Sequence, residues 1–215
     1  MPLQNRVTPM GDILAIPERG SFTGNRGILH DARTRTLSKR RWTGKAWLIC
    51  SLHWRGVRRA VMGGRSWTEL FFLDEATALA AGHRPCFLCR RAEARAYQAR
   101  FPTAEGIPPR AWEIDHALHA ERLDGRRKRL HPLTAGAAEL PDGAMILQDG
   151  APHLILGALA FPWSPAGYGE PVRPSDDSKL ITPPSTVSVL GAGFRPHIHE
   201  TAPVTALPRH FPIRK

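Results

Sequence analysis

Hydrophobic residues occur along this chain mostly in short runs separated by glycine and proline, a pattern typical of strands joined by turns. Residues 1–32 predict several such strands. Residues 46–50 predict another strand, with residues 60–62 as its hairpin partner. The run 70–73 predicts a short buried strand, and 144–148 with 153–156 predict a strand pair. Residues 162–184 contain many prolines and glycines and predict mostly loop.

Three segments have the composition or periodicity of helices. Residues 75–81 are rich in alanine, Asp74 before them is a good N-cap, and Gly82 after them can supply a left-handed stop. Residues 90–101 predict a second helix that ends before Pro102. Residues 112–123 predict a third, with Ile114 and Leu118 on its inner face. The mixture of helices and strands predicts an α+β fold.

The length of 215 residues allows one large domain or two small ones. The proline-containing stretch 107–109 resembles a linker, so we predict a basic N-terminal part over residues 1–105. A helix followed by a β-rich domain would occupy residues 106–215.

Composition narrows the class of protein. Hydrophobic residues make up 42% of the chain, which argues against global disorder, and the net charge of +11 favours polyanionic partners. We find neither a signal-peptide pattern at the N-terminus nor an apolar run of about 20 residues, as a membrane span needs. Three cysteines are too few for a disulfide scaffold of this size. We therefore expect a protein of the cytoplasm.

The spacing of the cysteines predicts a metal site. Cys86 and Cys89 lie two residues apart, so both thiolates can bind one ion, usually zinc. Cys50 ends a predicted strand and His53 lies three positions later. The predicted zinc ligands are therefore Cys50, His53, Cys86 and Cys89. In the alternative interpretation Cys50 is a small buried residue and His53 a surface group.

Residues 71–90 read FFLDEATALAAGHRPCFLCR. This segment resembles the second half of the Ada-type zinc-binding domain, a family of methylphosphotriester DNA repair, and a looser likeness covers about residues 47–91. The resemblance implies an Ada-like module of a small sheet with flanking helices, in which Cys86 and Cys89 correspond to the last two zinc ligands of the family. This chain has Cys50-Ser51-Leu52-His53 where the family has its first cysteine pair. The zinc fold can therefore carry over without the methyl transfer.

Residues 33–65 contain ten Lys and Arg and no acidic residue, with three tryptophans between them. Arginine binds phosphate and tryptophan can stack on an unpaired base, so this segment favours nucleic acid, DNA more than RNA. The predicted contacts are Arg40, Arg41, Trp42, Arg58, Arg59, Arg84, Arg90 and Arg91. Alternatively the tryptophans belong to the core and the arginines form a solvated face.

The helix predicted over residues 112–123 carries a possible catalytic set. Asp115, His119 and Arg122 share one face, and a carboxylate one turn from a histidine can raise its basicity. The predicted catalytic residues are Asp115, His119, Glu121 and Arg122, with His116, His131, Tyr168, His197 and His199 as open candidates for the same or another site. The alternative is an ordinary amphipathic helix with exposed charges.

These patterns together predict a zinc-binding, DNA-binding protein of DNA processing or repair, with hydrolytic activity as a nuclease or DNA-base hydrolase. The alternatives are a non-catalytic nucleic-acid-binding module with structural zinc, and a hydrolase of a small anionic substrate. The sequence leaves open the substrate, whether the zinc is structural or reactive, whether Cys50 is a nucleophile, and the oligomeric state.

Overall fold

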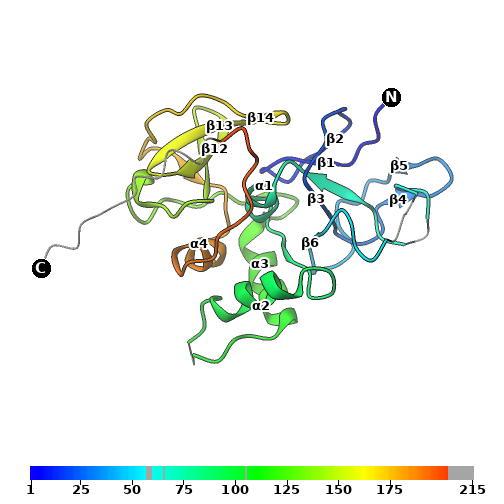
Figure 1. The fold of residues 1–215 in the computed structure, drawn as a ribbon, viewed down its shortest axis with the longest axis horizontal. Coiled ribbons are helices and arrows are strands. Elements are labelled where there is room, and N and C mark those ends of the chain that lie inside the picture. The colour runs from blue at the N-terminus through cyan, green and yellow to red at the C-terminus, as the bar shows by residue number, and fades with distance from the viewer. Residues whose placement is uncertain (57–59, 65, 105, 203–215) are drawn as a thin grey trace, which may run out of the picture.

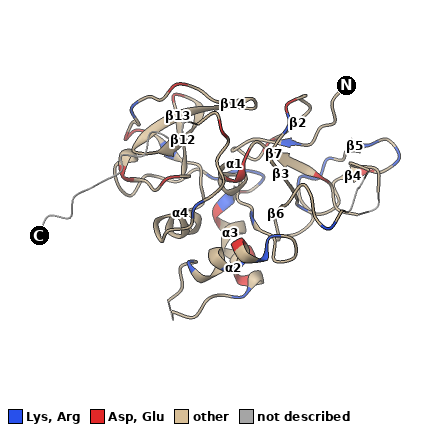
Figure 2. Ribbon diagram, viewed as in Figure 1, with Lys and Arg blue, Asp and Glu red and all other residues tan. Residues whose placement is uncertain are grey.

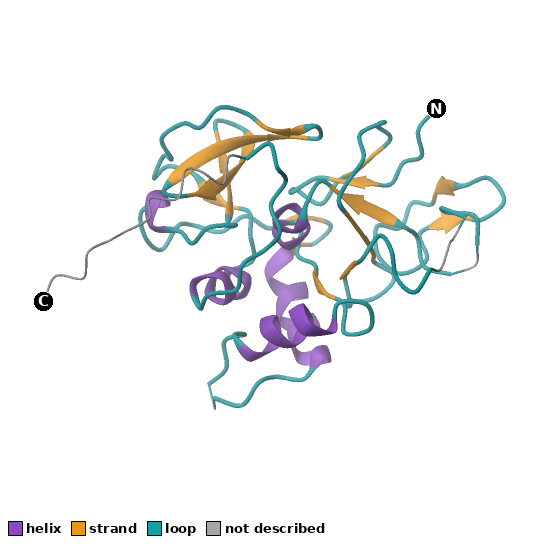
Figure 3. Ribbon diagram, in the orientation of Figure 1, coloured by secondary structure: helices purple, strands orange, loops and turns teal. Residues whose placement is uncertain are grey.

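The structure is a computed structural model that describes residues 1–56, 60–64, 66–104 and 106–202. Two separate β-sheets lie on either side of the buried helix α1 (Glu75–Ala80), and further helices lie beside them (Figures 1 and 3). The fold is therefore α+β, as expected, with more strand segments than helices.

The first sheet is built from the N-terminal part of the chain and has the strand order β2-β1-β7-β3-β6-β8. Its β1–β7 and β6–β8 pairs are parallel and the other pairs antiparallel. A separate hairpin, β4 (His30–Asp31) with β5 (Thr36–Leu37), extends from it. The sheet strands are β1 (Arg6–Val7), β2 (Ile13–Leu14), β3 (Phe22–Asn25), β6 (Leu48–Cys50), β7 (Leu70–Phe72) and β8 (Arg84–Pro85).

The second sheet is antiparallel, with the order β14-β13-β12-β11-β15. The predicted pairing of 144–148 with 153–156 is confirmed as β11 with β12. Residues 162–184 are mostly loop, as predicted, although they also contain the end of β13, all of β14 and all of β15. The strands are β11 (Met145–Gln148), β12 (Ala151–Leu156), β13 (Leu159–Ser164), β14 (Gly167–Tyr168) and β15 (Lys179–Leu180), and a small hairpin joins β9 (Leu123–Asp124) to β10 (Arg127–Lys128).

The three predicted helices are present as α1, α2 (Arg91–Ala99) and α3 (Ala111–Arg122). Asp74 caps α1 by accepting a hydrogen bond from the Thr77 amide at 2.8 Å. The structure adds a one-turn helix, η1 (Ala137–Glu139), and α4 (Pro184–Gly191). Pro184 is compatible with α4 because the first helical position needs no amide donor.

The predicted hairpin partner of β6 at residues 60–62 is wrong. Val61 and Met62 form a turn, closed by a hydrogen bond from the Gly63 amide to the Ala60 carbonyl at 3.0 Å. Met62 has a φ of 53°, which an extended strand cannot contain. The neighbours of β6 are instead β3 and β8, which are distant in sequence.

Two hydrophobic clusters meet at α1, whose six residues are all buried. The first combines residues of the first sheet, such as Ile49 and Phe72, with Ile114 of α3 and Val189 of α4. The second joins Ala76 and Ala80 of α1 to the apolar face of the second sheet. The domain boundary that we predicted at residues 105–106 therefore runs through a shared hydrophobic core.

Polar contacts at the start of α1 also connect the two parts. Asp74 accepts hydrogen bonds from the Tyr168 hydroxyl at 2.8 Å and from the His199 amide at 3.0 Å. Glu75 accepts from Arg90 at 2.6 Å and from the His197 amide at 3.0 Å. Burial, with the nearby Asp74 carboxylate, raises the pKa of Tyr168 well above its usual value, so this hydroxyl stays a hydrogen-bond donor.

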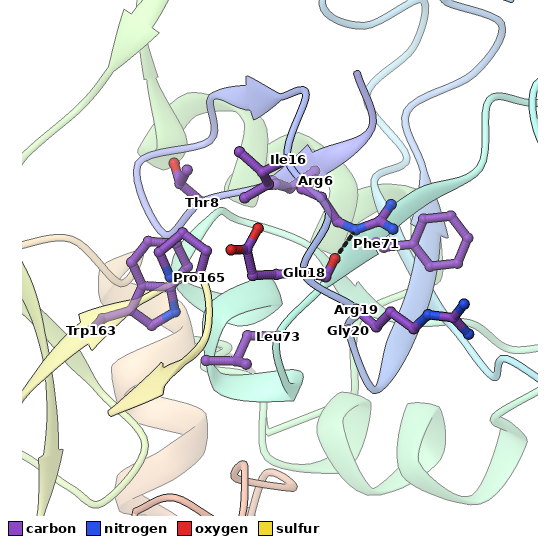
Figure 4. Close-up of a pocket in the computed structure, with 11 residues that line it drawn as sticks. Arg6, Thr8, Ile16, Glu18, Arg19, Gly20, Phe71, Leu73, Trp163 and Pro165 are labelled. Atoms are coloured by element: carbon purple, nitrogen blue, oxygen red, sulfur yellow. Dashed lines mark hydrogen bonds between the residues drawn. The ribbon is translucent and has the colours of Figure 1, made fainter. Parts of the chain in front are cut away.

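A small cavity lies between the N-terminal strands and β13, beside Glu18, Trp163 and Pro165 (Figure 4). Its volume is about 10 Å³, which is close to the minimum for one water molecule. The carboxylate atom Oε2 of Glu18 is buried there without a hydrogen-bond partner. This space is too small for a substrate.

Gly82 is predicted to be intolerant of substitution. Its φ is +88°, and a Cβ atom there would lie 2.6 Å from Cδ of Arg122. We expect Gly82→Ala to lower the free energy of unfolding by more than the 1–3 kcal/mol or so typical of backbone strain alone. Urea unfolding measures the loss. Gly150→Ala is the control, since Gly150 has a φ of +76° but open space around it. Equal losses in the two variants would contradict the clash.

Candidate metal centre

Three cysteines, the two of the predicted pair and Cys50, meet at the end of the first sheet. The parallel pairing of β6 with β8 aligns Ile49 with Pro85, so Cys50 and Cys86 follow at the same edge. A hydrogen bond from the Cys86 amide to the Ile49 carbonyl, 2.9 Å long, holds this register. The sulfur atoms of Cys50, Cys86 and Cys89 all lie within 4.8 Å of one another. The sheet therefore brings Cys50 together with two cysteines that follow it by 36 and 39 positions in sequence.

The segment from Cys86 to Cys89 forms a tight turn in which a backbone amide donates a hydrogen bond to a cysteine sulfur. The Leu88 amide donates a hydrogen bond to Sγ of Cys86 at 3.4 Å, and the Arg90 amide donates to the Cys86 carbonyl at 3.0 Å. Arg90 is the N-cap residue of α2, and its side chain forms a buried ion pair with Glu75. The turn is thus anchored at both ends, by the sheet and by a buried ion pair.

The protonation of the three thiols is coupled. Hydrogen bonds from Cys50 and Cys89 lower the pKa of Cys86, whereas hydrogen bonding to Cys86 and burial raise the pKa of Cys50. None of the three forms a disulfide. Three free thiols, with the thiolate form favoured at Cys86, are a suitable donor set for a soft divalent cation.

His53 does not join this cluster, contrary to our four-ligand prediction. Its side chain is exposed, and among the described residues only the three cysteines form the group. Ser51 follows Cys50 and donates its hydroxyl hydrogen bond to the Cys89 carbonyl at 3.4 Å, so the chain passes over the Cys86–Cys89 turn before His53 is reached.

A cavity of about 400 Å³ borders the cysteine cluster. All three cysteines line it, together with aromatic residues that include Trp54 and Phe71. Glu69 is the acidic residue of this lining and is only 6% exposed. One carboxylate oxygen of Glu69 accepts a hydrogen bond from the Met62 amide at 2.8 Å, which fixes the side chain. The cavity therefore offers thiols, a carboxylate and aromatic surface to a ligand.

The helix that we predicted to be catalytic is α3, and its residues form structural contacts. Asp115 accepts two hydrogen bonds of 2.8 Å from Arg84 in a buried ion pair. Glu121 accepts from the amide and the hydroxyl of Ser185 and so attaches α3 to the start of α4. Neither carboxylate is left to act on a substrate, so the structure does not support the catalytic roles predicted for them.

Arg122 and His119 contact each other, but in a different arrangement from the one predicted. Arg122 is 1% exposed and donates to the carbonyls of Gly82 and Lys45 and to Nδ1 of His119. Burial, together with the Arg122 charge, lowers the pKa of His119. The partner of His119 on this face is therefore a cation and not Asp115.

The predicted nucleic-acid contacts divide into three groups. Arg84 and Arg90 are buried in ion pairs with Asp115 and Glu75, so they do not reach a phosphate outside the protein. Arg40 and Arg91 are exposed, and Arg41 and Trp42 are half-buried. Arg58 and Arg59 lie outside the described residues.

The remaining histidines serve other contacts. His131 bonds to the Glu121 carbonyl through Nε2 at 2.8 Å, and His116 bonds through Nδ1 to the Trp112 carbonyl at 2.9 Å. The ring of His197 packs edge-on against Phe22, and Nδ1 of His199 contacts the Thr201 hydroxyl. None belongs to the cysteine cluster.

No sequence pattern singled out Glu69, Arg26 or His83. All three are buried, Glu69 and Arg26 line the two large cavities, and His83 accepts a hydrogen bond from Arg26. Glu69 directly precedes the apolar run of β7, and strand alternation places it on the same face as Phe71. That alternation was the available signal. Arg26 follows β3 without a distinctive motif.

Comparison with models of protein families, with curated proteins and with solved structures finds no match. The likeness to the Ada-type domain thus stays a prediction from the sequence. None of the helices in the described part of the chain is long and apolar enough to cross a membrane.

Proposed function

We propose that this protein binds zinc through Cys50, Cys86 and Cys89 and holds it with one coordination position facing the neighbouring cavity, where a substrate binds. The observation that carries this proposal is the meeting of three sulfur atoms, within 4.8 Å of one another, at the wall of a cavity of about 400 Å³. Among the described residues no fourth Cys, His, Asp or Glu belongs to the cluster.

The donor set fits zinc. Zinc–sulfur bonds of about 2.3 Å in a tetrahedron place two sulfurs roughly 3.8 Å apart, which agrees with this cluster after small adjustments. Three thiolates favour a soft or borderline ion over calcium or magnesium. The amide directed at Cys86 adds the outer hydrogen bonding that thiolate sites use to orient their ligands.

Three protein ligands with space for a fourth group are the arrangement of catalytic zinc sites, whereas structural sites are closed by four protein ligands. When bound, zinc would act as a Lewis acid on a group in the cavity. Glu69 can accept a proton there, and Trp54 and Phe71 offer aromatic surface to an apolar or planar part of the substrate. These roles support the hydrolytic interpretation more than a purely structural ion.

Cobalt substitution tests the open position. We expect the Co²⁺-loaded protein to show a sulfur-to-metal charge-transfer band, and a small exogenous ligand such as azide or imidazole to change the ligand-field spectrum at one equivalent of metal. The His53→Ala variant should give the same spectrum and the same zinc content as the unchanged protein. A spectrum that responds to no added ligand, but changes in His53→Ala, would show a closed four-ligand site instead.

A second proposal concerns nucleic acid. Arg33, Arg35, Lys39, Arg40 and Lys45 are exposed around the β4–β5 hairpin and the loop that follows it, where Figure 2 shows a concentration of basic residues. Within the described residues their side chains form no ion pair. Exposed, uncompensated arginines and lysines favour the phosphates of DNA, and a DNA substrate would link this surface to the zinc centre in DNA processing or repair.

Salt dependence and matched variants test this second proposal. We expect affinity for a short single-stranded DNA to fall steeply with salt, and the Arg33→Ala/Arg40→Ala variant to weaken binding and reduce the salt slope by about two. Arg95→Ala, an exposed arginine of α2, is the control. Affinity that does not change with salt would exclude phosphate contact.

Incubation with alkylated, abasic and undamaged DNA, with Glu69→Gln as the inactive comparison, tests for hydrolysis.

A further inference from the structure

A second large cavity is lined by residues just before β2, after β3, at the end of α3 and in the β9–β10 hairpin, and it shares no lining residue with the cavity at the cysteines. Its volume is about 520 Å³, within the range of small-molecule sites. One acidic residue, Asp12, lines it among the described residues. Six cations line it: Arg26, Arg41, Arg122, Arg126, Arg127 and Lys128. The neighbouring charges of this wall are therefore almost all positive.

Arg26 is the first of two buried guanidinium groups in this wall. It is 2% exposed, and its Nε and Nη1 atoms donate to His83 and to the Gly11 carbonyl. The remaining nitrogen, Nη2, is buried without a hydrogen-bond partner. A buried donor without an acceptor is costly, and a ligand in the adjoining cavity is one group that can supply the acceptor.

Arg122, at the end of α3, is the second buried guanidinium group of this wall. It is 1% exposed, and its Nε atom is also buried without a partner. The guanidinium groups of Arg26 and Arg122 both lie 3.9 Å from the centroid of the Trp47 ring. Trp47 therefore stabilises both cations through cation–π contacts, which offset part of their mutual repulsion.

Protein carboxylates do not neutralise this wall. Neither arginine, nor Lys128, forms an ion pair with an acidic side chain in the described part of the chain. Burial and the charges of Arg122 and Arg26 lower the pKa of Lys128 to about 7, and burial also lowers the pKa values of both arginines. The carboxylates that oppose these shifts, Asp12 for Arg26, Asp115 for Arg122 and Glu121 for Lys128, act without forming an ion pair with them.

We propose that this cavity binds the phosphate monoester of a nucleotide, with the phosphate against Arg26, Arg122 and Lys128 and the base beside the half-buried Trp42. A dianionic phosphate supplies the acceptors that the two buried guanidinium groups lack, and guanidinium groups bind phosphate in a fork-like geometry. Trp42 lines the same cavity, and its ring lies 6.0 Å from that of Trp47, so an aromatic surface is available for stacking. The ligand can be a free nucleotide or the phosphorylated end of a nucleic-acid strand. The free-nucleotide form is independent of the functions proposed above, whereas the strand form deepens the nucleic-acid proposal.

Calorimetric titration of the full chain tests this site with four probes: AMP, adenosine, and one oligonucleotide with and without a 5′-phosphate. We expect AMP to bind and adenosine to bind at least tenfold more weakly. Substituting the outer cations in an Arg41→Ala/Arg127→Ala variant should weaken AMP binding at least tenfold, and Arg95→Ala should leave it unchanged. These residues are half-buried or exposed, so the variant should keep the fold, which circular dichroism checks.

The oligonucleotide probes distinguish the two sources of the phosphate. Tighter binding of the 5′-phosphorylated strand than of AMP supports the end of a strand as the ligand, and equal or weaker binding supports a free nucleotide. The proposal is overturned if AMP binds no better than adenosine and the 5′-phosphate does not improve oligonucleotide binding. A Cys86→Ser protein that still binds AMP would separate this site from the metal centre, so failure at one site is not mistaken for failure at the other.

Discussion

Replacing Cys86 by serine is expected to reduce the zinc content of the purified protein from one ion per chain to nearly none. Cys86 is 8% exposed, and hydrogen bonds from Cys50 and Cys89 lower its pKa, which favours the thiolate form that zinc binds. A serine hydroxyl stays protonated and is a poor zinc ligand. Metal analysis by mass spectrometry, together with thermal unfolding with and without chelator, measures the loss.

The same substitution should lower stability, because the free energy of zinc binding contributes to that of folding. Thiolate sites of zinc-finger peptides supply roughly 10–16 kcal/mol at neutral pH, so even a small share would be visible as a large fall in melting temperature. His53→Ala, a substitution outside the cluster, should keep both zinc and stability. Cys86→Ser protein with undiminished zinc would exclude Cys86 as a ligand.

Replacing Asp115 by alanine is expected to lower the free energy of unfolding by about 3–5 kcal/mol, since it leaves the Arg84 charge buried without a partner. The two side chains are 6% and 10% exposed and form two hydrogen bonds of 2.8 Å. Urea unfolding monitored by tryptophan fluorescence measures the loss. Asp124→Ala, at an exposed position just after α3, should cost little and serves as the control.

A double variant separates the ion pair from other effects of the alanine. Arg84→Met/Asp115→Leu removes both charges and keeps apolar volume, so it should be more stable than Asp115→Ala alone. Zinc content should not change in any of these variants. An Asp115→Ala protein of unchanged stability would show that the pair contributes nothing and would reopen a functional role for this carboxylate.

Local signals predicted the fold best where the chain specifies its own geometry. Asp74 and Gly82 bound α1 as expected, because an N-cap acceptor and a left-handed stop act within a few residues. The strand pair β11–β12 followed from two apolar runs with a tight turn between them. The pairing of β6 with β3 and β8 did not follow, since long-range neighbours are decided by tertiary packing and not by adjacent sequence.

The candidate site was predictable in part for the same reason. Cysteine spacing predicts Cys86 and Cys89, and Cys50 was the one cysteine left to join them. His53 has suitable chemistry in a suitable interval, yet only the path of the chain after β6 decides where its side chain lies. The sequence does not distinguish a charged residue at the surface from one buried in an ion pair. For this reason the roles predicted for Arg84, Arg90 and Asp115 did not match their buried positions.

The adjacent acids Asp74 and Glu75 have a mechanical consequence. Glu75 binds Arg90, the residue next to Cys89, while Asp74 binds the Tyr168 hydroxyl of the distant sheet. A change at the thiol cluster can therefore reach the second sheet through a short series of hydrogen-bonded side chains, Arg90 to Glu75 and Asp74 to Tyr168. We expect loss of the ion to loosen both halves together, so that amide exchange quickens in β14 as it does in β6.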